Sequence, residues 1–321
     1  MPKLVVMPPL DDLKRSFAER LPTDLPEYTV VVPETEDDAR RELGDADAAY
    51  GWVPPALLPF AGKLAWLQNP DAGPHAGYFY PAMIDHPVVV CNPRGIYSDH
   101  ISQHIMMFLL ALARGLPYYA DAQRARRWEK EARPRPALDL TEATAIIVGV
   151  GGIGQETARL CAAFGMRVLG VDPRWELPAP DAEHHGPDDL DRLLPQADVV
   201  ITTTPHTPDT EGMWHAGRFA LMKQSAFFIN IGRGRTTKLD DLAAAIQSGQ
   251  IAGCGLDVFE MEPLPADHPL WTMPGVLLTP HVAVKDAENI PERRYQILRE
   301  NARRFAAGEP LRNVVDKVNW Y

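Results

Sequence analysis

The sequence predicts an α/β protein built from two doubly wound, parallel-sheet domains with a cleft between them. The chain has 321 residues, whereas a single domain usually has roughly 100–200. Short strand-like apolar runs alternate with helical or turn segments along most of the chain, as in parallel α/β sheets. Hydrophobic residues make up 45% and charged residues 23%, which is typical of a folded globular protein rather than a disordered chain.

The first domain is expected to form around five strands. A helix should follow at residues 101–113, where ten of thirteen side chains are apolar. Thirteen residues are fewer than the ~20 that span a bilayer, so a neighbouring domain or a second subunit is expected to cover this helix. The five expected strands are residues 4–7, 28–32, 48–52, 64–68 and 88–91.

The second domain is expected to contain six strands with helices between most of them. A Pro- and Arg-rich stretch at 126–136 precedes them and is typical of an exposed connection. A last helix, about 291–307, stops at Gly308 and should return to the first domain. The predicted division is therefore a discontinuous domain, 1–98 and 284–321, and a second domain, 99–283. The six expected strands are residues 145–148, 167–171, 199–203, 227–231, 251–258 and 276–278.

Charge and cysteine content narrow the possible partners. The formal net charge is -11, which argues against nucleic acid or an anionic membrane as a partner, because both require a basic face. Cys91, Cys161 and Cys254 are odd in number and far apart, so neither a disulfide framework nor a zinc site is indicated, and we expect no metal. The amino terminus resembles no export signal, and a cytoplasmic location is expected.

A glycine pattern indicates the cofactor. Gly149, Gly151 and Gly154 have the GxGxxG spacing directly after an expected strand and at the start of a helix, with Gly152 and Ile153 between them. Gly149 should make the tight turn, Gly151 should admit a pyrophosphate, and Gly154 should let helix and strand pack closely. An ordinary glycine-rich loop is the alternative for this pattern taken alone.

Asp172 strengthens the cofactor interpretation and favours NAD. It stands at the end of the next expected strand, where a carboxylate accepts hydrogen bonds from the adenosine ribose and repels a 2′-phosphate. Arg174 lies two residues further on, and its guanidinium can accommodate that phosphate. Both residues are predicted cofactor contacts, and NADP stays the alternative to NAD.

Three titratable residues are predicted to carry the chemistry. Arg233, Glu262 and His281 each follow an expected strand, and ligands bind at that edge of an open α/β sheet. A guanidinium can hold a substrate carboxylate and polarise a carbonyl, while a histidine oriented by a carboxylate can supply a proton. These residue types suit reduction of a 2-keto acid by a nicotinamide cofactor.

Several motifs of the chain are shared with a known family. They are GVGGIG at 149–154, HTPDTEGM at 206–213, INIGRG at 229–234, GLDVFEMEPLP at 255–265, HPLW at 268–271 and TPHVA at 279–283. Over nearly its whole length the chain thereby resembles the D-isomer-specific 2-hydroxyacid dehydrogenase family, in its glyoxylate/hydroxypyruvate reductase-like branch.

The resemblance implies a Rossmann cofactor domain, a flavodoxin-like substrate domain, a homodimer, and hydride transfer between NAD(H) and a small 2-keto acid or D-2-hydroxy acid in the reductive direction. It also assigns the family's catalytic residues to Arg233, Glu262 and His281.

Further cofactor contacts come from the resemblance alone. Thr204, Pro205 and His206 stand where the family meets the nicotinamide half of the cofactor. Asp257 matches the family's aspartate that contacts the nicotinamide carboxamide.

The substrate loop departs from the family pattern of a small-residue turn followed by an aliphatic residue and aspartate. Here residues 69–75 read Asn-Pro-Asp-Ala-Gly-Pro-His. The amides of Ala72 and Gly73 are predicted to bind the substrate carboxylate, together with Arg233 and His281. Pro74 has no amide hydrogen to offer, so the resemblance does not identify the substrate.

Two alternatives remain at the level of the sequence. One is an NADP-preferring glyoxylate/hydroxypyruvate reductase. The other is an NAD(H)-sensing, corepressor-like binding protein, because one branch of the resemblance group uses the same fold in that way.

Overall fold

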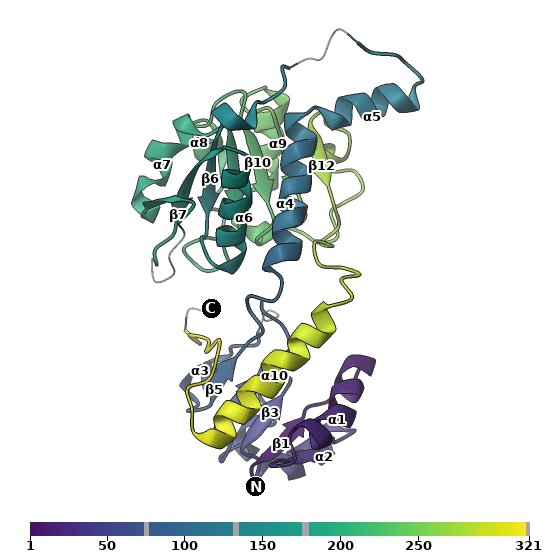
Figure 1. Ribbon diagram of the computed structural model, residues 1–321, viewed down its shortest axis with the longest axis vertical. Helices are drawn as coiled ribbons and strands as arrows, with labels where there is room; N and C mark the ends of the chain where they lie inside the picture. Colours follow the sequence, from purple (N-terminus) through teal and green to yellow (C-terminus); the bar gives the residue numbers. More distant parts are fainter. Residues whose placement is uncertain (74–76, 131–134, 175–179, 319–321) are drawn as a thin grey trace. The chain divides into compact units, whose positions relative to one another are not determined.

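The computed structural model describes residues 1–73, 77–130, 135–174 and 180–318. The chain divides into two compact units: Met1–Ile96 with Ala287–Tyr321, called unit 1, and Tyr97–Asp286, called unit 2 (Figure 1). Among the described residues, unit 1 holds a five-stranded sheet and unit 2 a seven-stranded sheet, and all neighbouring strands in both are parallel. The predicted fold class of two parallel α/β sheets is confirmed.

Unit 1 is doubly wound, with strand order β2-β1-β3-β4-β5, the flavodoxin-like arrangement. Along β1, alternate side chains point to opposite faces of the sheet: Leu4 and Val6 enter one core and Val5 the other. The five strands are β1 (Lys3–Val6), β2 (Thr29–Val31), β3 (Ala48–Tyr50), β4 (Trp66–Gln68) and β5 (Val89–Cys91).

Helices cover both faces of the unit 1 sheet. The core containing Leu4 and Val6 is closed by α1 (Asp12–Asp24) and α10 (Ile290–Ala307), and the other core by α2 (Glu36–Leu43) and α3 (Pro81–Asp85). The carboxy-terminal helix α10 therefore packs on the sheet formed by the start of the chain (Figure 1). It ends at Gly308, whose φ of 69° is left-handed and suits glycine.

Unit 2 has strand order β12-β11-β10-β9-β6-β7-β8. From β6 the chain adds strands β7 and β8 on one side and then crosses back to add β9 to β12 on the other side. The position between β6 and β9 is therefore the topological switch point, where a Rossmann sheet binds its ligand. The strands are β6 (Thr144–Val148), β7 (Arg167–Val171), β8 (Glu183–His185), β9 (Val199–Thr202), β10 (Phe227–Asn230), β11 (Gly253–Leu256) and β12 (Val276–Leu278).

The edge strand β8 corrects the prediction of six strands in this domain. It pairs with β7 at Leu169↔Glu183, and an Arg167–Glu183 ion pair of 2.8 Å joins the two strands. Its sequence, Glu-His-His, has no apolar alternation because it lies at the sheet edge, where Glu183 and His184 are exposed and His185 is half-buried. Hydrophobic pattern alone therefore misses it.

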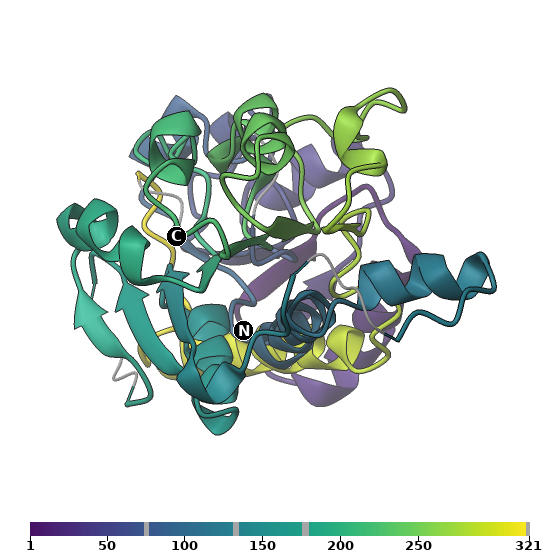
Figure 2. The same ribbon diagram turned by 90° about the horizontal axis from the view of Figure 1, so that it is seen from above.

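Helices cover both faces of the unit 2 sheet as well (Figure 2). On one face lie α4 (Ser98–Ala113) and α6 (Gly152–Ala163), and on the other α7 (Leu190–Leu193), α8 (Ala216–Phe219) and α9 (Leu239–Gln247). A Cβ at Gly255 in β11 would lie 2.6 Å from the Phe108 ring, so this glycine lets α4 sit close to the sheet. None of the described helices is long and apolar enough to cross a membrane.

The remaining elements are short. Helix α5 (Leu116–Arg124) follows α4 and projects away from the unit 2 sheet (Figure 1). The single 3-10 turns are η1 (Leu58–Phe60), η2 (Leu140–Glu142), η3 (Pro187–Asp189), η4 (Leu194–Gln196), η5 (Gly234–Thr236) and η6 (Pro269–Trp271).

Candidate active site

The three predicted catalytic residues follow three neighbouring strands. Strands β10, β11 and β12 are adjacent and parallel, and Arg233, Glu262 and His281 come after them in that order. The carboxyl ends of parallel strands meet at one edge of the sheet. The structure therefore places all three residues at the same edge of unit 2.

His281 and Glu262 form a hydrogen-bonded pair. His281 Nδ1 lies 2.8 Å from Glu262 Oε2, and the amide of Phe259 donates to Glu262 Oε1 at 3.0 Å. The carboxylate is thus fixed from both sides. With Nδ1 directed at Glu262, Nε2 is the ring nitrogen that can exchange a proton with a ligand. The imidazole is accessible, with 53% of its side chain exposed.

The backbone holds Arg233 in a tight turn. The amide of Gly232 donates to Asn230 Oδ1 at 2.9 Å, and the Arg233 guanidinium donates to the Gly232 carbonyl at 2.8 Å. Desolvation lowers the pKa of the guanidinium, while the neighbouring Glu262 carboxylate raises it. An arginine side chain stays protonated in proteins even when it is buried, so the site keeps a positive charge beside the His281–Glu262 pair.

Gly234 lets the turn of Arg233 pack closely against the segment that carries Glu262. A Cβ at Gly234 would lie 1.8 Å from the carbonyl oxygen of Phe259. The clashing atom belongs to the backbone and not to a flexible side chain, so only glycine at position 234 permits this close packing. The position of Arg233 relative to Glu262 therefore depends on direct backbone packing.

The glycine loop has the shape of a phosphate cradle. Gly149 has a φ of 92°, and a Cβ at Gly154 would lie 2.0 Å from the Gly149 carbonyl oxygen. Helix α6 begins at Gly152 after Gly151, which offers no side chain to cap the helix amides. Exposed amides at a helix amino terminus suit an anionic pyrophosphate.

Asp172 is anchored at the glycine loop. Its Oδ2 accepts from the Val150 amide at 2.7 Å and its Oδ1 from the Arg174 amide at 2.8 Å. Each carboxylate oxygen has a further lone pair that can accept from a ribose hydroxyl. Together with the phosphate cradle, this donor and acceptor set fits an adenine dinucleotide.

The segment after β9 approaches the same loop. Thr203 Oγ1 donates to the Gly149 carbonyl at 2.6 Å, and Thr204, which follows it, is 8% exposed. Pro205 accepts a hydrogen bond from Thr210 at 2.7 Å, and His206 Nε2 lies 3.6 Å from Glu211 Oε2. Ile153 packs against the core between the sheet and α6.

The predicted substrate loop belongs to unit 1. Ala72 and Gly73 follow β4, and the Ala72 carbonyl accepts from Asn92 Nδ2 at 2.9 Å. The predicted departure at Pro74, and His75 after it, lie outside the described residues. Carboxylate binding by the amides of Ala72 and Gly73 stays a prediction.

Sequence reasoning missed a partly buried hydrogen-bond network that contacts the turn of His281. Asp257, 1% exposed, accepts from Thr279 Oγ1 at 2.6 Å and from the amides of Val282 and Ala283 at 2.9 and 3.1 Å. His104 on α4 lies 2.8 Å from Thr279 Oγ1. The only signal in the sequence was a histidine within an apolar helix. The contact of Asp257 with a nicotinamide carboxamide stays a prediction.

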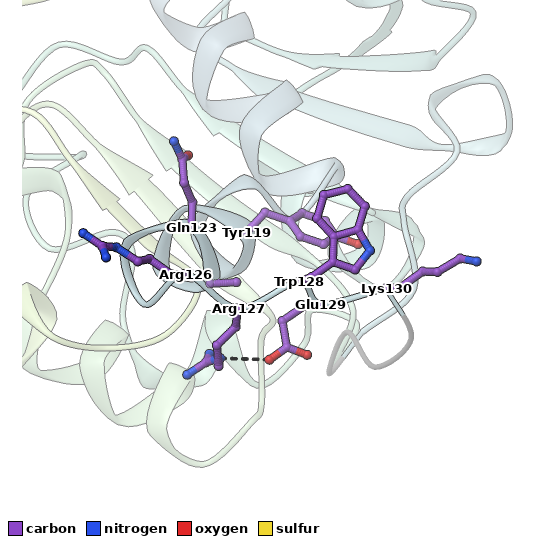
Figure 3. A pocket seen from close by; sticks show the side chains of 8 residues that line it. Tyr119, Gln123, Arg126, Arg127, Trp128, Glu129 and Lys130 are labelled. Atoms are coloured by element: carbon purple, nitrogen blue, oxygen red, sulfur yellow. Dashed lines mark hydrogen bonds and ion pairs between the residues drawn. The ribbon is translucent and has the colours of Figure 1, made fainter.

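A surface hollow of about 490 Å³ lies elsewhere, along α5 and the segment after it. Figure 3 shows the exposed Trp128 ring beside Tyr119, with Arg127 paired to Glu129. None of the predicted catalytic residues lines it. The three cysteines are free and buried, and the searched part of the chain, which excludes the four undescribed segments, holds no cluster of three metal-ligating side chains.

Comparison with known proteins relates both units to one family. A sequence model of the NAD binding domain of the D-isomer specific 2-hydroxyacid dehydrogenases matches residues 106–283. Glyoxylate/hydroxypyruvate reductase B of Citrobacter koseri is 33% identical over 78% of this chain and 78% of its own. D-3-phosphoglycerate dehydrogenase of Archaeoglobus fulgidus is 32% identical over 71% of this chain, but over only 43% of its own length.

Solved structures agree with these relatives. A D-isomer specific 2-hydroxyacid dehydrogenase of Xanthobacter autotrophicus, in complex with NADPH and MES, has a TM-score of 0.82 at 29% identity, covering 100% of this chain and 99% of that one. The NADPH-dependent glyoxylate/hydroxypyruvate reductase of Sinorhizobium meliloti has a TM-score of 0.80 at 27% identity, with 100% of both chains covered. The chain described here belongs to the D-isomer specific 2-hydroxyacid dehydrogenase family.

Proposed function

We propose that this protein reduces a small 2-keto acid to the D-2-hydroxy acid with NADH, and catalyses the reverse reaction with NAD. The observation that carries the proposal is the 2.8 Å contact between His281 Nδ1 and Glu262 Oε2, at the sheet edge where Arg233 also lies. The bound nicotinamide supplies the hydride equivalent. The residues of the chain bind the acid and deliver the proton.

Each catalytic side chain has a separate task in this proposal. Arg233 binds the substrate carboxylate and polarises the adjacent carbonyl. His281 Nε2 donates a proton to the carbonyl oxygen as negative charge develops there, and Glu262 stabilises the imidazolium form before that transfer. The amides of Ala72 and Gly73 are proposed as further contacts of the substrate carboxylate.

The cofactor is held by the glycine loop and Asp172. The α6 amides after Gly151 bind the pyrophosphate, and Thr204, Pro205, His206 and Asp257 line the nicotinamide half. NAD is proposed over NADP because the Asp172 carboxylate is fixed at the loop by the Val150 amide, where it repels a 2′-phosphate.

A panel assay tests the proposed activity. Purified protein is mixed with NADH and, in turn, glyoxylate, hydroxypyruvate, pyruvate and larger 2-keto acids, and absorbance of NADH is followed. At least one acid should oxidise NADH at a rate proportional to protein concentration. Tight NADH binding with no turnover on any acid would contradict the proposal and favour the NAD(H)-sensing alternative.

An NADP-preferring glyoxylate/hydroxypyruvate reductase is the second candidate. It is favoured by the structurally similar enzymes from Xanthobacter autotrophicus and Sinorhizobium meliloti, whose structures hold NADPH or NADP, and by Arg174 beside Asp172. The same panel run with NADPH separates the two candidates through the ratio of kcat/KM for the two cofactors.

We also propose a homodimer in which the cofactor domain supplies the interface. Large apolar side chains are exposed along α4, α5 and the segment that follows: Met107 is 46% exposed, Leu116 56%, Tyr119 42% and Trp128 95%. Clusters of exposed apolar side chains commonly mark protein interfaces. A second copy of this chain is the proposed cover.

A further inference from the structure

We propose that His104 is a positioning residue for the reaction: acting through the Thr279 hydroxyl, it holds the Asp257 carboxylate against the backbone that presents His281. This inference rests on the function proposed above. It concerns a helix and a side chain that do not belong to the Arg233–Glu262–His281 set.

His281 needs external support because of its backbone conformation. Its φ is 55°, a left-handed value that costs energy for any residue with a side chain and persists only where the surroundings impose it. The His281 amide donates to the Asp257 carbonyl at 2.8 Å. The next two amides, of Val282 and Ala283, donate to the Asp257 carboxylate. Asp257 therefore holds three consecutive amides of this turn.

The orientation of the Asp257 carboxylate depends in turn on Thr279. Thr279 Oγ1 donates its proton to Asp257 Oδ1 at 2.6 Å. A hydroxyl has one proton, so Thr279 must act as the acceptor in its 2.8 Å contact with His104 Nε2. The proton of that second bond belongs to His104. The chain of donors therefore runs from His104 to Thr279 to Asp257.

The surroundings of His104 suit this role. Burial lowers the pKa of His104, against the opposing effect of the Asp257 carboxylate, which favours a neutral imidazole with a single ring proton. Its ring packs edge-on against Phe108 at a centroid distance of 4.9 Å. Phe108 in turn occupies the space left by Gly255 in β11, so the His104 ring is held at the sheet.

Hydrogen exchange tests the geometric part of the inference without any turnover. Exchange into peptides covering residues 279–286 is measured by mass spectrometry in the wild type, His104→Leu and His104→Gln. Leucine removes the donor, whereas the glutamine amide nitrogen can occupy the place of Nε2. We expect faster exchange in His104→Leu and near wild-type exchange in His104→Gln. The variant Gln103→Ala, at an exposed position of the same helix, controls for general loosening of α4.

Kinetics then test the catalytic part. We expect kcat for keto acid reduction to fall about tenfold in His104→Leu and Thr279→Val, roughly the effect of losing one net hydrogen bond from a partly buried network. His104→Gln and Thr279→Ser should keep most of the activity. The double variant His104→Leu/Thr279→Val should lose no more than Thr279→Val alone, because that variant already removes the bond that His104 makes.

The outcomes separate this inference from the proposed function. Unaltered exchange at 279–286 in both His104→Leu and Thr279→Val, or multiplied losses of kcat in the double variant, would overturn the inference while wild-type activity stands. A wild type that reduces no keto acid would overturn the proposed function, yet the exchange contrast would still decide the geometry. If His104→Leu does not fold, Thr279→Val and Thr279→Ser repeat both comparisons from the hydroxyl side.

Discussion

At the scale of single residues, His281 carries the largest expected kinetic effect. Its Nδ1 lies within hydrogen-bond distance of Glu262, so loss of the ring removes the proton donor that Glu262 orients. In His281→Ala, we expect kcat for keto acid reduction to fall by about 10²–10⁴, the usual share of general acid catalysis. Steady-state assays at saturating NADH measure this effect. His184→Ala, in the exposed edge strand β8, is the matched control, and equal activity in both variants would remove His281 from the mechanism.

Asp172 is expected to decide between the two cofactors. Asp172→Asn keeps the size of the side chain but removes the charge that opposes a 2′-phosphate. We expect the ratio of kcat/KM for NADH to that for NADPH to fall about tenfold or more, since hydrogen bonds to charged groups contribute ~1.5–3 kcal/mol. Asp188→Asn, an exposed carboxylate on η3, should leave the ratio unchanged. An unchanged ratio in Asp172→Asn would contradict the assignment of this carboxylate to the ribose.

The sequence predicts residue positions well where strand order alone determines them. Arg233, Glu262 and His281 each follow a strand, and parallel strands bring their carboxyl ends to one edge. The network of His104 could not be predicted in the same way. Thr279 lies 175 residues from His104, and the tight fit of Phe108 on Gly255 that brings them together appears only in the folded chain.

At the scale of elements, the turn that carries Arg233 and the segment that carries Glu262 pack backbone against backbone, with no side chain between them. Any Cβ at Gly234 would strike the Phe259 carbonyl and push the turn of Arg233 away from the segment of Glu262. Because a misplacement of about 1 Å can cost about 10²-fold in rate, we expect that loss of kcat in Gly234→Ala. NADH affinity should be retained, since the glycine loop follows a different strand.

Gly186→Ala is the matched control for that prediction, because a Cβ there would meet no atom within 4 Å. Thermal melting of both variants shows whether each is folded. Wild-type kcat in a folded Gly234→Ala would mean that the two turns do not depend on this contact.

Elements with a clear apolar pattern could be predicted and polar ones could not. Strands β1–β7 and β9–β12 are mostly apolar in sequence, and the expected ranges overlap all of them. Strand β8 has the sequence Glu-His-His and is stabilised by pairing with β7 and by the Arg167–Glu183 ion pair. Those interactions come from tertiary structure, so a local pattern does not reveal them.

At the scale of the whole molecule, the exposed apolar surface of α4 and α5 predicts a dimer. Light scattering should give twice the chain mass of 35.6 kDa. The dimer of the variant Tyr119→Ser/Trp128→Ser should be weaker and should dissociate at a higher protein concentration than the wild type, because the variant lacks two large exposed apolar groups. Phe164→Ser, which is also exposed in unit 2, controls for general loss of surface hydrophobicity. A wild-type mass of 35.6 kDa would contradict the dimer.

The division into two units and the parallel sheets follow from length and from the alternation of strands and helices. The predicted cleft between the domains stays a prediction, and so does the identity of the keto acid, because the loop at 69–75 departs from the family pattern. Side-chain size in a pocket built from several loops does not follow from linear sequence.

Isotope transfer shows whether hydride passes from the nicotinamide to the keto acid at the site of Arg233, Glu262 and His281. NADH carrying deuterium at C4 of the nicotinamide, on one face or the other, is incubated with the protein and the best acid of the panel other than glyoxylate, whose product has no D or L form. The product is analysed by mass spectrometry and chiral chromatography. We expect deuterium on carbon 2 of the D-2-hydroxy acid from one face only, and loss of product in His281→Ala. Product without deuterium from either face, or an L-2-hydroxy acid, would contradict it.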